Sequence, residues 1–189
     1  MAFGYSVTII TSSDGTTWDN RTSGTSYVLP GGTYGNSIFV TVGDIGTILT
    51  SSDAITWTSR TSGTSNKLRG ITYGNSPFVA VGKSGTILTS SDATTWTSRE
   101  SGSVSLMAVN YANNKFVAVG GGKISTSTDG ITWTDTGDST GGNEVTYGNN
   151  THVVVGGINS SGYSTDGTSW THKRISSAGD NLESIIYKE

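Results

Sequence analysis

A seven-residue sequence that ends in tryptophan recurs five times along this chain. Its copies read SSDGTTW at 12–18, SSDAITW at 51–57, SSDATTW at 90–96, STDGITW at 127–133 and STDGTSW at 164–170. They contain all 5 tryptophans, which follow one another at intervals of 39, 39, 37 and 37 residues: Trp18, Trp57, Trp96, Trp133 and Trp170. A constant period of about 40 residues indicates one repeating structural unit that cannot bury its faces alone. We therefore expect a single domain, residues 1–189, built as one array of similar units.

The repeating unit is clearest in residues 68–99, where four short β-prone segments alternate with turn residues. The segments read LRGITYGN, SPFVAVG, KSGTILTS and SDATTWTSR. Apolar runs that end at Gly, Asn, Ser or Asp predict strands joined by tight turns. A composition with 27 Gly, 31 Thr and 29 Ser but only 2 Pro favours strands and turns over helices. Each unit is therefore predicted to be a four-stranded antiparallel meander.

The two ends of the chain carry complementary parts of one unit. The C-terminal LESIIYKE (182–189) matches LRGITYGN (68–75), and the N-terminal AFG matches the AVG that follows in the same unit. Residues 178–189 would thus supply the first strand of a blade whose other strands come from 1–21. Such a shared blade closes a ring and leaves only short sheet edges, whereas an open rod needs a cap at each end. The predicted fold is an all-β, five-bladed β-propeller of four-stranded antiparallel blades, closed by N- and C-terminal strands in one blade.

The aspartate and the tryptophan of each copy are predicted to be structural. A carboxylate and a serine hydroxyl in a tight turn accept hydrogen bonds from backbone N–H groups, here at Asp14, Asp53, Asp92, Asp129 and Asp166. Burying an indole contributes about 4–6 kcal/mol gross, against about 1.5–3 kcal/mol for one hydrogen bond to a charged group. We therefore expect Trp96→Ala to destabilise the fold more than Asp92→Ala. Because Ala54 and Ala93 replace the glycine of other copies, this position is not expected to need a positive φ.

The motif S-x-D-G-x-T-W resembles the Asp-box, or bacterial neuraminidase repeat, of sialidases, other glycoside-cleaving or glycan-binding propellers and photosystem assembly factors. The unit GTILTSSD..TW with YGN..FVAVG is similar to bacterial and phage-encoded Asp-box propellers. The resemblance covers essentially the whole chain, although these copies have one residue fewer between Asp and Gly than the usual family box. In the family the box is structural and lies away from the ligand face. The resemblance therefore implies a propeller fold more than it implies an activity.

Catalytic groups are not expected from this sequence. Fivefold repetition places the box aspartates one per blade, whereas the two carboxyls of a glycosidase lie within about 10 Å of each other. A sialidase needs clustered arginines, but Arg21, Arg60 and Arg99 share one repeat position and are interpreted as separated, solvated edge-strand charges. His152 takes the place of a repeated phenylalanine and is interpreted as a partly buried strand residue. We expect no catalytic residue, no metal site and no cofactor.

The net charge and the N-terminal sequence limit the classes of partner that we expect. With 11 basic and 14 acidic residues the net charge is −3, which does not suit a protein that tracks a nucleic-acid backbone. The N-terminus has neither a basic segment nor a long apolar run, so we expect no signal peptide and no insertion into a membrane. The chain has 0 Cys, which excludes disulfides but leaves the compartment open, extracellular or virion-associated settings included.

Function is expected where the repeats differ from one another, because the scaffold itself is constant. The loops between second and third strands, and those leading to the next blade, share the face opposite the boxes, which we call the loop face. At the aligned position that begins the first strand, the units carry different side chains, among them Arg69, Asn143 and Glu183. These three residues and the nearby Tyr27, Asn66 and Lys67 are the ligand-binding candidates. The leading hypothesis is a non-catalytic binding module, lectin-like, for a glycan or a protein surface. The alternatives are a structural or adhesion component of a phage virion or larger assembly, as an oligomer or as a single copy, and an unrecognised glycoside hydrolase.

Overall fold

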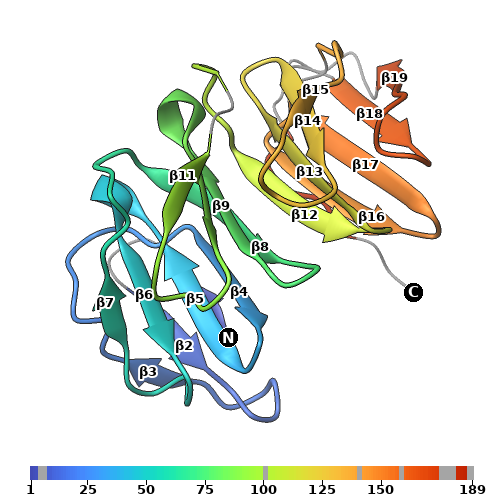
Figure 1. The fold of residues 1–189 in the computed structure, drawn as a ribbon. Coiled ribbons are helices and arrows are strands. Elements are labelled where there is room, and N and C mark those ends of the chain that lie inside the picture. Colours follow the sequence, from blue (N-terminus) through green and yellow to red (C-terminus); the bar gives the residue numbers. More distant parts are fainter. Residues whose placement is uncertain (4–7, 100–101, 140–141, 158–159, 175–181, 187–189) are drawn as a thin grey trace.

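A computed structural model describes residues 1–3, 8–99, 102–139, 142–157, 160–174 and 182–186, and they form five antiparallel sheets (Figure 1). The first sheet contains β1 Ala2–Phe3, β2 Ile9–Thr11 and β3 Asp19–Arg21. The second contains β4 Gly31–Gly35, β5 Ile38–Val42, β6 Ile48–Ser51 and β7 Thr58–Arg60. The third contains β8 Leu68–Tyr73, β9 Phe78–Gly82, β10 Ile87–Ser90 and β11 Thr97–Arg99. The fourth contains β12 Ala108–Ala112, β13 Lys115–Gly120, β14 Lys123–Ser127 and β15 Thr134–Asp135, and the fifth β16 Glu144–Gly148, β17 Thr151–Gly156, β18 Ser160–Ser164 and β19 Thr171–Arg174.

Consecutive strands pair within every sheet, so the predicted antiparallel meander is confirmed. The hairpins between first and second strands turn through pairs of residues with positive φ, such as Asn113 (50°) and Asn114 (57°). Two such residues in succession give the twist that a tight hairpin between right-twisted strands requires, and asparagine tolerates this conformation well. The repeated Asn-Asn and Asn-Ser pairs of the sequence therefore fix the register of each hairpin.

In the described part of the chain, the hydrophobic core lies between the sheets and consists of four separate clusters. In β9, Phe78 and Ala80 pack toward the second sheet, whereas Val79 and Val81 pack toward the fourth. All five residues of β9 are consequently buried, which explains why this segment reads as a continuous apolar run, FVAVG. A sheet of this kind is stable only between two neighbours, as the repeat period predicts.

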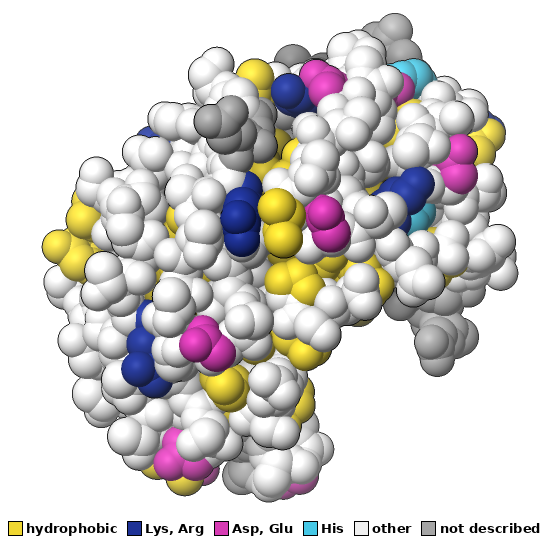
Figure 2. Space-filling view, viewed as in Figure 1, with side chains coloured by type: hydrophobic (Ala, Val, Ile, Leu, Met, Phe, Trp, Pro, Cys, Tyr) yellow, Lys and Arg dark blue, Asp and Glu magenta, His cyan; other side chains and the backbone are white. Residues whose placement is uncertain are grey.

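The five sheets form an open arc. The first strands β4, β8, β12 and β16 lie side by side in that order, and Figure 2 shows a crescent with a wide opening. Of the predicted shared blade, residues 178–181 and 187–189 lie outside the described part of the chain, and residues 182–186 form no strand with β1. The predicted ring closure is therefore not found, and the first sheet has three described strands. Within the described residues β1 contributes Ala2 and Phe3 to this sheet, and neither pairs with residues 182–186.

The described C-terminal segment, residues 182–186, contacts the connection just before β16. The side-chain amide of Asn143, just before β16, donates a hydrogen bond to the backbone oxygen of Leu182 at 3.0 Å. Beyond it, Ile186 is 91% exposed. The segment thus contacts the fifth sheet on one side and leaves an apolar side chain without a neighbour.

The box aspartates lie in the turns between third and fourth strands. Each carboxylate accepts hydrogen bonds at 2.8 Å from the backbone N–H groups two and three residues further on, as Asp92 does from Thr94 and Thr95. The serine two residues earlier donates a further hydrogen bond, from Ser90 to Asp92 at 2.9 Å. The carboxylate therefore replaces the backbone partners that this turn lacks.

Two expectations about the box need correction. Ala54 and Ala93 have φ values of 62° and 60°, so the position does require the left-handed conformation, because only this turn brings both N–H groups onto one carboxylate. The tryptophan side chains are only partly buried, and Trp18 is 46% exposed. The indole N–H groups of Trp96, Trp133 and Trp170 also cap the turn, because each donates to the backbone oxygen three residues earlier, as Trp96 does to Ala93 at 3.2 Å.

We expect Ala54→Gly to stabilise the protein by up to about 1 kcal/mol, because glycine adopts a positive φ without the steric cost that alanine has. The reverse change, Gly130→Ala, should destabilise it, since φ there is 74° and a Cβ would lie 2.9 Å from the side chain of Val79. Urea denaturation of both variants measures the two effects. A destabilised Ala54→Gly protein would show that the turn is not strained at alanine.

The box also predicts acid sensitivity. Hydrogen bonds from the N–H groups of Thr56 and Ile55 lower the pKa of Asp53 to about 2. A carboxylate with a depressed folded-state pKa stabilises the fold above its unfolded value of about 3.9, and this contribution is lost as the pH falls toward about 2. Asp53→Asn should therefore lose less stability than the wild type between pH 4 and pH 2.5, measured by urea midpoints. Parallel losses in the two proteins would contradict this assignment.

Candidate functional site

A pocket of about 570 Å³ opens on the loop face, between the second and third sheets. Its walls are the connection before β4, the 3₁₀ turn Asp44–Gly46, the connection before β8 and the start of the 3₁₀ turn Lys83–Gly85. The lining residues of this loop-face pocket are Tyr27, Asp44, Ile45, Ser65, Asn66, Lys67 and Lys83. Backbone hydrogen bonds join each turn to the preceding connection, from Asp44 to Val28 at 3.1 Å and from Lys83 to Lys67 at 2.8 Å.

The charges of the pocket are two ammonium groups and one carboxylate. The Lys67 ammonium lies 2.8 Å from Asp44 Oδ1, and both side chains are about 30% exposed. That contact has the distance of an ion pair, but Asp44 Oδ1 accepts no hydrogen bond in the described structure. Lys83 is exposed and forms no ion pair with a described residue. Asp44 Oδ1 is thus buried against the Lys67 ammonium, and Lys83 is the ammonium group of the pocket that has no ion pair among the described residues.

An exposed and strained isoleucine lies at the same pocket. Ile45 has φ 54° and ψ 37°, and its side chain is 57% exposed. The left-handed region is strongly unfavourable for a β-branched residue and costs about 1–2 kcal/mol. The equivalent residue of the third sheet is Ser84, with the same φ of 54°. Both the strained backbone and the exposed apolar side chain of Ile45 are unfavourable for stability, so Ile45 is a candidate ligand contact.

The six residues predicted from the sequence separate into two groups. Tyr27, which is 44% exposed, lines the loop-face pocket together with Asn66 and Lys67. The Asn66 amide donates to Thr86 Oγ1 at 2.9 Å, which holds it against the turn of the third sheet.

The other three predicted residues lie in or beside the row of first strands. Arg69 lies in β8 at an irregularity in the pairing with β9, with its Nε buried and without a hydrogen-bond partner. Asn143 precedes β16, and Glu183 is exposed in the segment next to it. These three residues do not line the loop-face pocket. Sequence alignment identified Tyr27, Asn66 and Lys67 because they lie beside an irregular repeat position. Ile45 and Lys83 belong to the loops between second and third strands that the sequence also assigns to the loop face, but the pattern did not select them as ligand-binding residues.

The arginine series differs from the prediction of solvated edge charges. The Nε groups of Arg21, Arg60 and Arg99 each donate to a threonine ten residues earlier at 2.8 Å, and all three residues are half-buried. The threonine lies on the neighbouring third strand, close to the register of the arginine. Cross-strand geometry of this kind places the guanidinium over its own sheet instead of in open solvent.

His152 is fully buried, not partly buried as predicted. Its ring lies 4.6 Å from the ring of Tyr147 and 6.5 Å from that of Trp170, measured between centroids. Neither ring nitrogen has a hydrogen-bond partner in the described structure. Burial lowers the pKa of His152, and the Lys115 ammonium lowers it further. A neutral imidazole therefore occupies a site that phenylalanine fills in three other sheets.

Among the residues that the structure describes, no three His, Cys, Asp or Glu side chains lie close enough together to hold a metal ion. No helix in the described part of the chain is long and apolar enough to span a membrane.

No protein-family model and no curated protein matches this chain. Among solved structures, it is similar to YCF48 bound to D1 peptide, at 18% identity over 91% of this chain and 62% of that one, with a TM-score of 0.68. It is also similar to the GH74 enzyme of Niastella koreensis, at 18% identity over 89% of this chain and 30% of that one, with a TM-score of 0.63. YCF48 from Cyanidioschyzon merolae matches at 19% identity over 88% of this chain and 63% of that one, with a TM-score of 0.57. The chain thus spans about three fifths of YCF48 and under a third of the GH74 enzyme, and the likeness shows the fold alone, an array of β-propeller type.

Proposed function

We propose that the protein is a non-catalytic binding module whose ligand lies in the loop-face pocket. The observation that carries the proposal is the gathering of an exposed aromatic ring, an exposed strained isoleucine and an unpaired ammonium in one recess. Pockets that bind ligands combine apolar walls with a few polar groups that fix orientation. A glycan suits this pocket, because the Tyr27 ring can lie against the apolar face of a sugar while Asp44 and Lys83 bind hydroxyls.

A glycan array tests this proposal. Wild-type protein should bind a defined subset of glycans, and Tyr27→Ala should weaken that binding about tenfold or more, as expected for loss of about 1.5 kcal/mol of contact energy. Tyr34→Ala is the matched control, since Tyr34 is 58% exposed but packs on Phe39 away from the pocket. An array without any signal, or equal loss in both variants, would contradict the glycan proposal.

A second candidate is docking on a protein segment of a larger assembly, such as a virion. It is favoured by Ile45, whose exposed aliphatic side chain suits an apolar peptide side chain better than a sugar, and by the peptide-bound state of YCF48. Ile45→Gly should then raise stability while it reduces co-purification with the assembly. Unchanged co-purification would argue against this candidate.

We also propose that the working form is a closed ring, in which the C-terminal segment completes the first sheet. The support is the repeat match of 182–189 to a first strand, the contact of Leu182 with Asn143 and the exposure of Ile186. Closure would cover Ile186 and the free edge of β1 together.

A further inference from the structure

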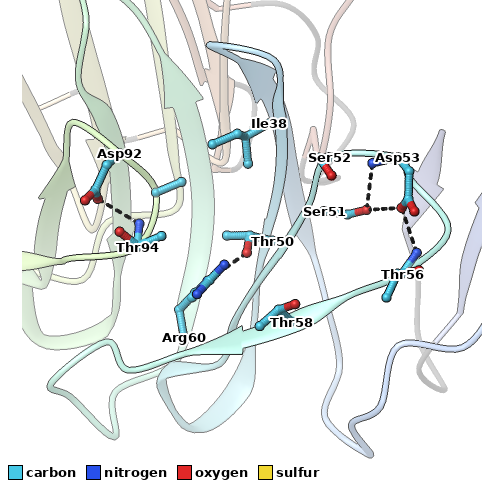
Figure 3. A pocket seen from close by; sticks show the side chains of 11 residues that line it. Ile38, Thr50, Ser51, Ser52, Asp53, Thr56, Thr58, Arg60, Asp92 and Thr94 are labelled. Carbon is cyan, nitrogen blue, oxygen red and sulfur yellow. Dashed lines mark hydrogen bonds between the residues drawn. The ribbon is translucent and has the colours of Figure 1, made fainter.

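Two equivalent grooves lie on the side of the boxes, remote from the loop-face pocket. The groove of the second sheet has a volume of about 200 Å³, and Figure 3 shows Thr50, Arg60 and Asp92 in its walls. The groove of the third sheet has a volume of about 300 Å³ and is lined by the corresponding residues Thr89, Arg99 and Asp129. Each box-side groove therefore runs between the fourth strand of one sheet and the box turn of the next.

The arginine of each groove is held in place but is not neutralised. Arg60 Nε donates to Thr50 Oγ1 at 2.8 Å, which fixes the guanidinium and leaves its two Nη groups for other acceptors. No carboxylate of a described residue lies within ion-pair distance of Arg60 or Arg99. A half-buried guanidinium in this state favours a planar, bidentate oxygen ligand.

In the first sheet, the arginine at the same repeat position is neutralised by a carboxylate of its own strand. There the Asp19 carboxylate accepts from Arg21 Nη2 at 2.9 Å. The residues at the position of Asp19 in the second and third sheets are Thr58 and Thr97, as the strand register shows. Two successive sheets thus lack the internal carboxylate that the first sheet supplies.

The opposite wall of each groove suits hydroxyl groups. The Asp92 carboxylate faces the groove from the next box, and hydrogen bonds from Thr94 and Thr95 hold its pKa well below the ordinary value, so it stays charged. Thr50, Thr58 and Ser52 add hydroxyls. The Asp92 carboxylate would repel a polyanion that has no hydroxyl groups to donate to it. A neutral sugar, in turn, would give the arginine guanidinium no anionic partner. A sugar that carries one carboxylate satisfies both walls.

We propose that the two box-side grooves bind uronic acid units of an acidic polysaccharide, with the uronate carboxylate on the arginine and the sugar hydroxyls on the aspartate and the threonines. Adjacent grooves engage the same polymer chain, so affinity rises with polymer length. The loop-face pocket is not needed for this binding.

Affinity electrophoresis with polygalacturonate as the probe tests the proposal. The double variant Thr58→Asp, Thr97→Asp reproduces the internal pair of the first sheet in both grooves and should reduce retardation at least about tenfold. The double variant Ser59→Asp, Ser98→Asp adds the same two charges at exposed positions of the same strands outside both grooves, and it should bind as the wild type does. Melting temperatures of both variants show that the fold persists.

Four further outcomes decide the proposal. Highly methyl-esterified pectin, the same backbone without the charges, should bind at least about tenfold more weakly, and equal binding would show that the carboxylate is not recognised. Poly-glutamate should bind weakly, and equal binding would exclude a role for the sugar hydroxyls. Tyr27→Ala should bind polygalacturonate normally, and loss of binding in this variant would move the site to the loop-face pocket and overturn the inference. A wild-type protein that is not retarded at all would also overturn it.

Discussion

Replacing His152 by phenylalanine should stabilise the protein by about 1–3 kcal/mol at neutral pH, the cost of a buried polar group without hydrogen bonds. The same position holds Phe39, Phe78 and Phe116 in other sheets, and the rings of Phe78 and Phe116 contact a tyrosine and a tryptophan much as His152 does. The fifth sheet therefore already provides an aromatic site of the right shape. Urea denaturation at pH 7.5 measures the gain.

The advantage of His152→Phe should grow as the pH falls. Burial and the Lys115 ammonium lower the pKa of His152, while the Asp166 carboxylate opposes them, so the unfolded chain binds the proton more readily than the folded one. Stability of the wild type then falls as the pH drops below the unfolded value of about 6.5, and the phenylalanine variant lacks this loss.

The control for this pH dependence is His172→Gln, because His172 is half-exposed and its Nε2 lies 2.8 Å from the Asp138 carboxylate. We expect this variant to keep the loss of stability between pH 7.5 and pH 5.5 that His152 causes. If His152→Phe shows the same pH dependence as the wild type, the imidazole is hydrated or hydrogen-bonded in solution and the assignment is wrong.

Replacing Trp96 by alanine should destabilise the protein by about 2–4 kcal/mol, somewhat less than truncation of a fully buried aromatic residue. The Trp96 indole packs on the core cluster between the second and third sheets, with its ring 6.5 Å from that of Phe78. Its N–H group also donates a hydrogen bond to the Ala93 oxygen, so the variant loses both the packing of the indole and a cap of the turn.

Asp92→Ala should cost less than Trp96→Ala, because Asp92 lies at the surface and water can replace its carboxylate at the N–H groups of Thr94 and Thr95. Trp18→Ala provides an internal control, since Trp18 is 46% exposed and should matter less than Trp96. Chemical denaturation of the three variants ranks them. If Asp92→Ala is the most destabilised, the carboxylate and not the indole organises the box.

Repetition made much of the fold predictable from the sequence. Identical residue types at a constant spacing identified the four-stranded units, the turn that holds Asp92 and the shared position of Arg60 and Arg99, because period and turn chemistry are local properties of a chain. The same comparison showed that Tyr27 and Asn66 lie beside an irregular position.

The features that escaped prediction depend on backbone geometry across strands or between sheets. The positive φ of Ala54 follows from the hydrogen bonds that the turn makes, and alanine gives no sign of it. The bond of Arg60 to Thr50 follows from strand register, and the strain at Ile45 from a turn whose sequence differs in every sheet. Ring closure depends on how far two chain ends can pair, which the match of their sequences does not determine.

Closure of the ring is tested most directly by one engineered disulfide. The chain has 0 Cys, and in the third sheet Ile71 lies opposite Ala80, the positions that Ile185 and Ala2 would share in a completed first sheet. Residues paired across antiparallel strands are about 4.5–5.5 Å apart, within the range that a disulfide can bridge. After oxidative refolding, Ala2→Cys, Ile185→Cys should form an intramolecular disulfide in the monomer as completely as the reference pair Ile71→Cys, Ala80→Cys. A variant that stays reduced, or that forms only disulfide-linked dimers, while the reference pair oxidises, would contradict a ring closed by the two ends of one chain.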